Sequence, residues 1–491
     1  MAHTKIVVTI GPATCNRESL LALAEAGMSV ARLNGSHADT EWHRTAIQLI
    51  RSLLPNLPIL LDIPGRKIRT VSLAHEPHFA AGDKIVLTTD VTFDGHTKVP
   101  VNYVSLHADV KPGDIIVADD GTLRFSVEAV EGLDIICRAT RCGTLRSRKG
   151  INVPFVKLNT SLITQRDRQV VAFACELGVD FVGISFVESA AHVHAIRELA
   201  GGKTPQILAK IENQGGMDHL DEVVDAADAI MIDRGDLSVE TSLETLVIYQ
   251  KRIIDVARSK GKPVIVATEM LNSMIENDFP SKAEVADITN AVLDGCSATM
   301  LSGETAIGRF PVIAVQTMRR IADAAFAHLG TRPRSSYGSS DNSTPSEAIG
   351  DAIAMILRSV PVTKVVAITR GGYAARMLSA RSVAQPIFAI SDDAAMARLF
   401  NLYSSVEGIH FNAPFPSGSA DHIKACIRML YSLAKLDQSD LILVTGVVYP
   451  RSGTRMNLIQ IHKVSDLIEE FAWASTASSS KDTLRTPVAT L

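Results

Sequence analysis

The sequence has few aromatic residues, few cysteines and no long hydrophobic run. Aromatic residues make up 5% of the 491 residues, and the hydrophobic residues, 46% in total, are spread along the chain. No apolar run reaches the roughly 18 residues that a membrane-spanning helix needs. A strand-like segment at 6–8 follows the N-terminus directly, so we expect no signal peptide. These features predict a protein that does not interact with membranes.

The six cysteines are scattered, without the spacing of zinc ligands or of a disulfide framework. We therefore expect reduced thiols and a cytoplasmic location. The formal net charge of −4 argues against general binding of nucleic acids. The chain also lacks the Walker-type phosphate loop and the dinucleotide-binding glycine motif, which excludes those two classes of nucleotide site.

What the chain does contain is a repeated pattern of short β-branched runs, each followed by a helical stretch. The runs lie at 4–10, 29–34, 58–63, 180–186, 206–212, 229–236, 263–270 and 298–302. Near-continuous apolar strands that alternate with helices indicate a parallel sheet buried on both faces. Eight such units favour a closed (β/α)8 TIM barrel. An open, doubly wound α/β sheet is the competing interpretation.

The pattern is interrupted between the third and the fourth run. From 71 to 149, short strand-like segments alternate with Gly-containing turns, which predicts an all-β domain inserted at the top of the barrel as a lid. A chain of this length should form two to four domains, and a Gly/Ser/Pro-rich stretch at 330–345 is typical of a linker. The predicted domains are a barrel at 1–70 and 150–330, the β lid at 71–149, a C-terminal α/β domain at 346–474 and a disordered tail at 475–491.

Charged side chains lie at the ends of several predicted barrel strands. They are Arg32, Asp62, Lys210, Glu212 and Asp236. The carboxyl ends of the strands form the active site of such barrels, and buried charges are costly unless they are paired or bind a metal. Taken singly, a Lys or Arg could be solvated, Asp236 could cap a helix and Asp62 could belong to a turn. Their joint occurrence at converging strand ends favours an active site.

These residue types suit phosphoryl transfer. Glu212 and Asp236 offer the oxygen ligands that Mg²⁺ prefers. Lys210, Arg32 and Arg69 can neutralise an anionic substrate and the charge on a transferring phosphoryl group. Such a reaction depends on positioning and electrostatics more than on covalent help from the protein.

The chain resembles the pyruvate kinases, closely over 4–330 and more loosely over 346–470. The matching segments are 5–12, 26–34, 149–154 (Lys-Gly-Ile-Asn-Val-Pro), 210–213 (Lys-Ile-Glu-Asn), 234–237 (Arg-Gly-Asp-Leu) and 300–306 (Met-Leu-Ser-Gly-Glu-Thr-Ala). The resemblance implies transfer of the phosphoryl group of phosphoenolpyruvate to ADP, giving pyruvate and ATP in the last step of glycolysis. It also implies Mg²⁺ or Mn²⁺ as cofactor, a mobile lid, a regulatory C-terminal domain and a homotetramer.

The resemblance further implies roles for individual residues. Lys210 would hold the phosphoryl group in flight, Glu212 and Asp236 would bind the divalent ion, and Arg32 would meet the substrate phosphate. The nucleotide side would comprise Asn34, His37, Arg69, Lys149 and Asp120. The pocket that binds K⁺ in many members would comprise Asn34, Ser36 and Asp62, with Lys67 beside it.

The chain departs from the family pattern at several of these positions. Ser281 replaces a Thr but keeps the hydroxyl of the relay that protonates the enolate, so we count it as catalytic. Gly35 replaces a Phe and is expected to loosen the substrate loop. Ser238 replaces a Gly and adds bulk beside Gly235, whose backbone approaches the substrate carboxylate. Both changes bear on substrate affinity and leave the reaction type as it is.

Lys67 stands where K⁺-requiring members have a Glu. Its ammonium could supply the charge of the ion, so we predict that K⁺ is not required; a Lys67 that points to solvent is the alternative. In the C-terminal domain, Thr369, Arg370, Gly371 and Gly372 replace the hydroxyl-rich loop of effector-regulated members and could bind a phosphorylated effector through backbone N–H groups. Two other functions are weighed: action on another enol phosphate, and a non-catalytic subunit that binds nucleotides or sugar phosphates.

Overall fold

The computed structural model describes residues 3–65, 67–119, 121–156, 158–159, 161–202, 204–329, 344–415, 420–447 and 455–473. The chain forms two compact units, Thr4–Thr331 and Arg332–Leu491, the second of which includes Met1–His3. The predicted linker at 330–345 lies almost wholly outside the described residues, and the predicted tail at 475–491 lies entirely outside them.

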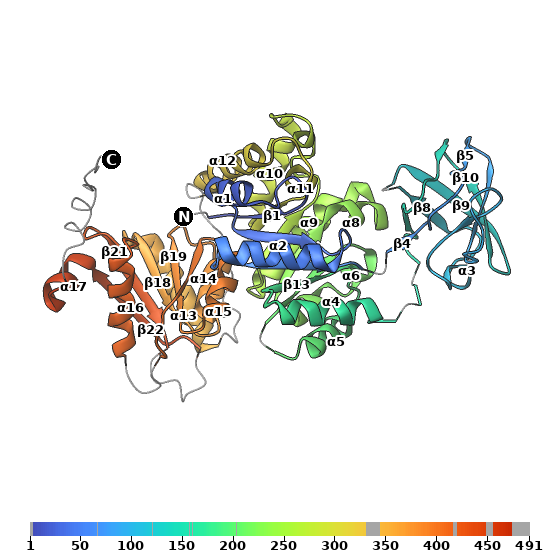
Figure 1. The fold of residues 1–491 in the computed structure, drawn as a ribbon. Coiled ribbons are helices and arrows are strands. Elements are labelled where there is room, and N and C mark those ends of the chain that lie inside the picture. Colours follow the sequence, from blue (N-terminus) through green and yellow to red (C-terminus); the bar gives the residue numbers. More distant parts are fainter. Residues whose placement is uncertain are drawn as a thin grey trace, which may run out of the picture. The chain divides into compact units, whose positions relative to one another are not determined.

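A closed barrel of eight parallel strands forms the centre of the first unit (Figure 1). Around the barrel the strands follow the order β1-β17-β16-β15-β14-β13-β3-β2. Their bounds are β1 (Lys5–Thr9), β2 (Val30–Asn34), β3 (Ile59–Ile63), β13 (Phe181–Ile184), β14 (Gln206–Ile211), β15 (Ala229–Asp233), β16 (Val264–Ala267) and β17 (Ala298–Leu301). The predicted barrel is confirmed, and the doubly wound alternative is wrong.

Amphipathic helices surround the barrel. They are α1 (Arg17–Ala26), α2 (Thr40–Leu53), α4 (Gln165–Glu176), α5 (Ala190–Ala200), α6 (Gln214–Asp218), α7 (Leu220–Ala226), α8 (Arg234–Glu240), α9 (Leu246–Ser259), α10 (Lys282–Asp294), α11 (Gly303–Ala306) and α12 (Pro311–Leu329), with 3-10 turns η1 (Leu243–Thr245) and η2 (Asn272–Ile275). Local signals set their ends: Asn16 accepts a hydrogen bond from Ser19 N at the start of α1, and Gly27 ends that helix with φ 118°.

The two faces of each barrel strand have different roles. In β15, Ile230 and Ile232 belong to the apolar core that the strands share with the helices. Successive side chains of a strand point to opposite faces, so Ala229, Met231 and Asp233 face the barrel interior. Asp233 is the last inward-facing residue of its strand and therefore lies at the mouth of the barrel.

Residues 68–152, called the insert below, form an all-β structure between β3 and β13, as predicted. Its seven-stranded sheet has the order β4-β12-β8-β9-β10-β6-β7, and a separate pair joins β11 to β5. The bounds are β4 (Ile68–Arg69), β5 (His78–Phe79), β6 (Lys84–Thr88), β7 (Val99–Pro100), β8 (Ile115–Ala118), β9 (Leu123–Glu131), β10 (Asp134–Ala139), β11 (Gly143–Thr144) and β12 (Gly150–Asn152), with the short helix α3 (Leu106–Asp109). The insert has an apolar core of its own, centred on Phe79 and Phe125.

The second unit holds a five-stranded sheet of order β20-β19-β18-β21-β22, in which β22 alone is antiparallel to its neighbour. Its strands are β18 (Lys364–Ile368), β19 (Ile387–Ser391), β20 (Val406–His410), β21 (Leu441–Gly446) and β22 (Leu458–Lys463). Its helices are α13 (Pro345–Ser359), α14 (Tyr373–Ala380), α15 (Ala394–Leu399), α16 (Asp421–Ser432) and α17 (Val464–Phe471), with the 3-10 turn η3 (Phe400–Leu402).

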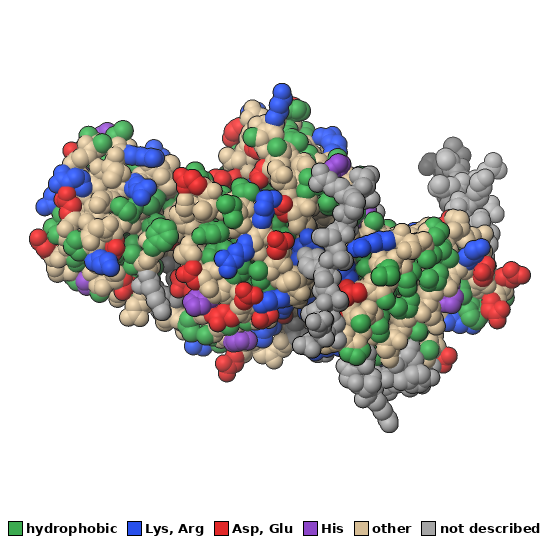
Figure 2. All heavy atoms as spheres, turned by 180° about the vertical axis from the view of Figure 1, so that it is seen from behind, with side chains coloured by type: hydrophobic (Ala, Val, Ile, Leu, Met, Phe, Trp, Pro, Cys, Tyr) green, Lys and Arg blue, Asp and Glu red, His purple; other side chains and the backbone are tan. Residues whose placement is uncertain are grey.

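Hydrophobic side chains gather on one face of the second unit in the view of Figure 2. The exposed large hydrophobic residues that the structure describes in this unit are Met355, Leu433 and Ile461. In the first unit, Leu243, Val247 and Ile248 are exposed close together along the chain. Among the described helices, none has the length and hydropathy that would let it cross a bilayer.

Candidate active site

Arg32 and Asp62 form a buried ion pair at the mouth of the barrel. Nε and Nη2 of Arg32 lie 2.8 and 2.7 Å from Asp62 Oδ2, and Nη1 donates to Thr9 Oγ1 at 3.1 Å. The three residues occupy neighbouring strands, since β2 pairs with both β1 and β3. A charged pair that is buried in this way is oriented by its own hydrogen bonds, so the guanidinium is fixed at the strand ends before any substrate binds.

Lys210, near the end of β14, lies between the carboxylates of Glu212 and Asp233 at the mouth of the barrel. Its Nζ is 2.6 Å from Glu212 Oε1 and 3.0 Å from Asp233 Oδ2. Glu212 is fully buried, and its Oε2 accepts a hydrogen bond from the Phe186 amide at 2.6 Å. Lys210 also donates to Ser185 Oγ at 3.3 Å. An ammonium with this many partners in a buried setting has a defined position.

Asp236 lies in the first turn of α8, because β15 ends at Asp233 and the helix begins at Arg234. The predicted strand over 229–236 is therefore three residues too long. Lys67 Nζ lies 2.5 Å from Asp236 Oδ1, and the Lys67 side chain is only 19% exposed. The alternative in which Lys67 points to solvent is wrong.

The first turn of α8 is held by Thr268, the residue directly after β16. The Gly235 amide donates to Thr268 Oγ1 at 2.9 Å, and Arg234 donates to the carbonyl of Thr268 at 2.7 Å. Ser238 Oγ donates back to the Gly235 carbonyl at 2.9 Å. Ser238 thus bonds within the first turn of α8, where the sequence predicted only added bulk.

The charges of this cluster do not balance. Burial alone would lower the pKa of Lys210, but the carboxylates of Glu212 and Asp233 raise it instead. Burial raises the pKa of Glu212 to about 8, and the charges of Asp233 and Asp236 add to the rise. Burial and the Asp233 charge also raise the pKa of Asp236, against the attraction of Lys67. If all three carboxyl groups were ionised, their charge would exceed that of the two ammonium groups by one, and a divalent cation would stabilise that ionised form.

The donor set fits such a cation. One carboxylate oxygen from each of Glu212, Asp233 and Asp236 lies within 4.8 Å of the others. Hard divalent cations such as Mg²⁺ prefer carboxylate oxygens. Glu212 and Asp236 are predicted from the sequence as ligands, whereas Asp233 is not. The alternation of β15 could have found it, because 229, 231 and 233 share the inward face.

The residues expected on the nucleotide side fall into two groups. Arg69 and Lys149 lie at the base of the insert, where Arg69 Nη1 donates to the Arg148 carbonyl at 3.1 Å and Lys149 pairs with Asp119 at 2.7 Å. Asn34 and His37 follow β2: Asn34 Oδ1 accepts from the Ser36 amide at 3.1 Å, and the His37 carbonyl bonds the ring of His43. Asp120 lies outside the described residues.

The members of the expected K⁺ pocket have different partners. Asp62 pairs with Arg32, Lys67 pairs with Asp236, and Asn34 bonds the backbone of Ser36. Gly35 lies against β3: its amide donates to the Asp62 carbonyl at 3.0 Å, and a Cβ at this position would be 2.4 Å from that oxygen. The close approach favours a glycine in this backbone conformation, and the predicted loosening of the substrate loop stays a prediction.

Ser281 is the N-cap of α10. Its side chain accepts from the Glu284 amide at 3.2 Å, and the Glu284 carboxylate bonds the Ser281 amide in return, which completes a capping box. The same carboxylate bonds the amide and hydroxyl of Ser273. Ser281 is exposed. The capping role is what the structure assigns to it, and its catalytic role stays a prediction.

The expected effector loop connects β18 to α14 in the second unit. Arg370 Nε lies 3.2 Å from Asp392 Oδ2, and Arg370 also donates to the Phe415 carbonyl. Gly372 has φ 76°, and a Cβ there would lie 2.4 Å from the ring of Phe400. Thr369 is buried, whereas Gly371 faces open space.

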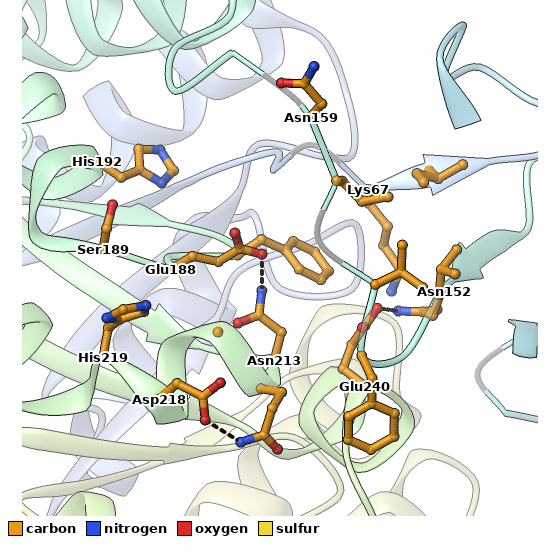
Figure 3. A pocket seen from close by; sticks show the side chains of 18 of the residues that line it. Lys67, Asn152, Asn159, Glu188, Ser189, His192, Asn213, Asp218, His219 and Glu240 are labelled. Carbon is orange, nitrogen blue, oxygen red and sulfur yellow. Dashed lines mark hydrogen bonds between the residues drawn. The ribbon is translucent and has the colours of Figure 1, made fainter. Parts of the chain in front are cut away.

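A cavity of about 780 Å³ is lined by Lys67, the partner of Asp236, and by Asn213, the neighbour of Glu212 in the chain (Figure 3). One side is lined by the segment that leaves the insert, including Asn152 and Phe155, and the other by barrel residues such as Glu188 and Glu240. Lys67 lines the same cavity. Figure 3 shows two of its hydrogen bonds, from Asn213 to Glu188 at 3.1 Å and from Asn152 to Glu240 at 2.6 Å.

Comparison with known proteins gives one consistent family. Residues 1–315 match the model of the pyruvate kinase barrel domain, and 347–462 match that of the pyruvate kinase alpha/beta domain. A pyruvate kinase of Bacillus licheniformis is 37% identical over 480 residues, 95% of this chain and 81% of the relative. One of Mycobacterium tuberculosis is 35% identical over 470 residues, 94% and 98% of the two chains. A crystal structure of a pyruvate kinase from Cryptosporidium parvum superposes with a TM-score of 0.85 at 31% identity, covering 94% of this chain and 96% of that one.

Proposed function

The chain belongs to the pyruvate kinase family, and on that basis we propose how its residues carry the family reaction. That reaction transfers the phosphoryl group of phosphoenolpyruvate to ADP and gives pyruvate and ATP, the last step of glycolysis. The observation that carries the assignment to this site is the convergence of Lys210 with Glu212, Asp233 and Asp236 at the barrel mouth. Pyruvate formation from phosphoenolpyruvate and ADP, followed in a coupled assay, tests it. No turnover with Mg²⁺ or Mn²⁺ present would refute it.

Arg32 is the proposed partner of the substrate phosphate. Its guanidinium is fixed by Asp62 and Thr9, so it offers its charge without reorganising when substrate arrives. Preorganised donors of this kind stabilise charge in a water-poor site far better than mobile ones. The Gly235 backbone at the start of α8 is the proposed neighbour of the substrate carboxylate, beside the Asp236 side chain.

Lys210 is the proposed partner of the phosphoryl group during transfer. The carboxylates of Glu212 and Asp233 raise its pKa, so the ammonium stays charged through the neutral pH range. A phosphoryl group in flight spreads negative charge over its equatorial oxygens, and a fixed ammonium next to those oxygens lowers the barrier. Arg69, on the insert side, would add a second positive charge, and the Ser281 hydroxyl is proposed to take part in protonating the enolate.

Glu212 and Asp236 are the proposed ligands of a Mg²⁺ or Mn²⁺ ion, with Asp233 as a third carboxylate within reach. When bound, the ion polarises phosphoryl oxygens and balances their charge. The chain's own contribution is to gather the three carboxylates and to keep Lys210 beside them. The close gathering of the three carboxyl groups supports this assignment, as do the raised pKa values of Glu212 and Asp236, whose full ionisation a bound cation would favour.

We propose that this enzyme does not require K⁺. Lys67 places an ammonium 2.5 Å from Asp236, where it can supply a fixed positive charge. The Asn34, Ser36 and Asp62 pocket would then orient substrate without a bound ion.

The insert is the proposed lid, and Lys149, Asp120, Asn34 and His37 the proposed contacts of ADP. Residues 1–70 and 150–330 would form the barrel domain, 71–149 the lid domain, and 346–474 a regulatory domain with an effector loop at Thr369–Gly372. Its Arg370 is paired with Asp392, so a phosphorylated effector would have to compete for that guanidinium.

We also propose a homotetramer and a cytoplasmic location. The exposed apolar residues Leu243, Val247 and Ile248 are suited to a contact between subunits. The free state of all six cysteines agrees with a reducing compartment. Light scattering of the purified protein tests the tetramer, and a monomeric mass at micromolar concentration would refute it.

A further inference from the structure

The chain passes from the barrel into the insert and back again, and at both passages a residue of the chain bonds to the same face of helix α8. Asp236 lies in its first turn and Glu240 is its last residue, and residues four apart share a face of an α-helix. Lys67, directly before β4, donates to Asp236 Oδ1 at 2.5 Å. Asn152, the last residue of β12, donates from Nδ2 to Glu240 Oε1 at 2.6 Å (Figure 3). The chain enters the insert beside the first bond and leaves it at the second.

The two crossing strands are also paired with each other. β12 runs antiparallel to β4, with Gly150 opposite Arg69. A Cβ on Gly150 would lie 2.8 Å from Lys67 Cε. The glycine therefore leaves the space through which the Lys67 side chain reaches α8. Lys67, β4, β12 and Asn152 thus form one connected unit at the base of the insert.

The bond between Asn152 and Glu240 lies beside the cavity of about 780 Å³. Asn152 is only 2% exposed, and a buried amide needs a hydrogen-bond partner. Glu240 Oε1 supplies that partner at 2.6 Å, and ionisation of Glu240 makes the bond charge-assisted. The cavity leaves few packing contacts on that side. The hydrogen bond between Asn152 and Glu240 is therefore the specific contact that holds the insert at this place.

We propose that Asn152 and Glu240 are positioning residues for phosphoryl transfer. Their bond holds the base of the insert, and with it Lys149, in register with Asp236 on the same face of α8. The proposal rests on the proposed roles of Asp236 and Lys149. A shift of the insert at Glu240 is transmitted over a single helical turn, about 5.4 Å, to the carboxylate of Asp236.

Kinetics of two alanine variants test the bond. Asn152→Ala removes the donor and Glu240→Ala removes the acceptor. We expect each variant to lower kcat about tenfold or more, while KM for phosphoenolpyruvate changes less than about threefold, because the lost interaction concerns alignment and not ground-state binding of that substrate. The double variant Asn152→Asp/Glu240→Gln restores an amide–carboxylate pair with the direction of donation reversed, and it should recover most of the lost kcat.

The single variant Asn152→Asp gives a pH signature that a purely structural role would not. It places two carboxyl groups together, which can share a proton but repel each other once both are ionised. Burial raises the pKa of Glu240 to about 7. The charged groups that face Glu240 are Lys67, Asp236 and Glu188, and all three are unchanged in the variant. The kcat of Asn152→Asp relative to wild type should therefore fall as the pH rises through neutrality.

Two matched controls accompany these variants. Asn159→Asp makes the same chemical change in the same segment, at a residue that also lines the cavity. Glu244→Gln neutralises an exposed carboxylate shortly after α8. Both variants should keep the wild-type kcat, and the ratio of their kcat to that of wild type should not change with pH.

Distance measurements give a readout apart from activity. Cys142 in the insert and Cys175 in α4 are both exposed, so spin labels on them, in a Cys15→Ser background, report the separation of insert and barrel. We expect a narrow distance distribution that broadens in Asn152→Ala and narrows again in the double variant. Unchanged distributions with wild-type kcat in both alanine variants would overturn the proposal. A wild-type protein without kinase activity would instead refute the proposed function.

Discussion

Asp62 occupies space that Gly183 leaves free: a Cβ built on Gly183 would lie 2.0 Å from Asp62 Oδ1. The two residues are register partners on the adjacent strands β3 and β13. Asp62 in turn orients Arg32. Because Gly183 has no side chain, the Asp62 carboxylate fits beside it and orients Arg32, the cation that is proposed to bind the substrate phosphate.

Gly183→Ala should displace Asp62 and so weaken substrate binding. Overpacking a tight interior typically costs about 1–3 kcal/mol of stability, and a misplaced Arg32 should lower kcat/KM for phosphoenolpyruvate by about tenfold or more. Steady-state kinetics and thermal unfolding measure the two effects. Gly202→Ala is the control, because a Cβ there meets its nearest atom only at 3.4 Å. Normal kcat/KM in Gly183→Ala would show that the Asp62 position does not matter.

Asp236→Ala should abolish Mg²⁺-dependent turnover while the barrel stays folded. The variant removes a proposed metal ligand at the start of α8 and leaves Lys67 without that partner. Circular dichroism and a kinetic titration with Mg²⁺ check both parts. Near-normal activity would mean that the ion is held elsewhere.

Asp233→Asn should weaken binding of the divalent ion to the enzyme without substrates. The change keeps the shape of the side chain and removes one of the three carboxylate charges. Loss of a group that supports a metal site typically lowers affinity about 10–100-fold, and the electron paramagnetic resonance signal of free Mn²⁺ measures it directly. If Asp233→Asn binds Mn²⁺ as tightly as wild type does, Asp233 is a partner of Lys210 and does not support the metal site.

Lys67→Glu should create a requirement for K⁺. The substitution changes the local charge by two units and places a carboxylate where the ammonium now pairs with Asp236. Initial rates in a tetramethylammonium buffer, with and without KCl at constant ionic strength, provide the measurement. The wild-type enzyme should respond little to KCl. A tenfold or greater activation of wild type would contradict the role given to Lys67.

The eight barrel strands could be predicted because each is a short, almost continuous apolar run. The end of β15 was misplaced for a physical reason. Asp233 and Arg234 continue the run in sequence, but Arg234 turns back to bond the carbonyl of Thr268, and a helix begins there. A strand that ran to Asp236 would also put Asp233 in its interior and not at its end.

The contacts of the site depend on residues far apart in the chain. Lys67 meets Asp236 across 169 positions, and Asn152 meets Glu240 across 88. Pairings between residues so far apart in the chain cannot be predicted from the pattern of neighbouring residues. The residue types at strand ends predicted a cluster of charges, but which ammonium pairs with which carboxylate follows only from the closed barrel and the insert.

The central claim is that Lys210 acts on charge that develops during phosphoryl transfer. The direct measurement compares Lys210→Met with wild type in kcat and in binding of phosphoenolpyruvate, the latter by titration without ADP. The account predicts that kcat falls by roughly 10²–10³ or more, while the dissociation constant of phosphoenolpyruvate changes only a few-fold. A variant with normal kcat, whose defect is confined to substrate binding, would contradict it.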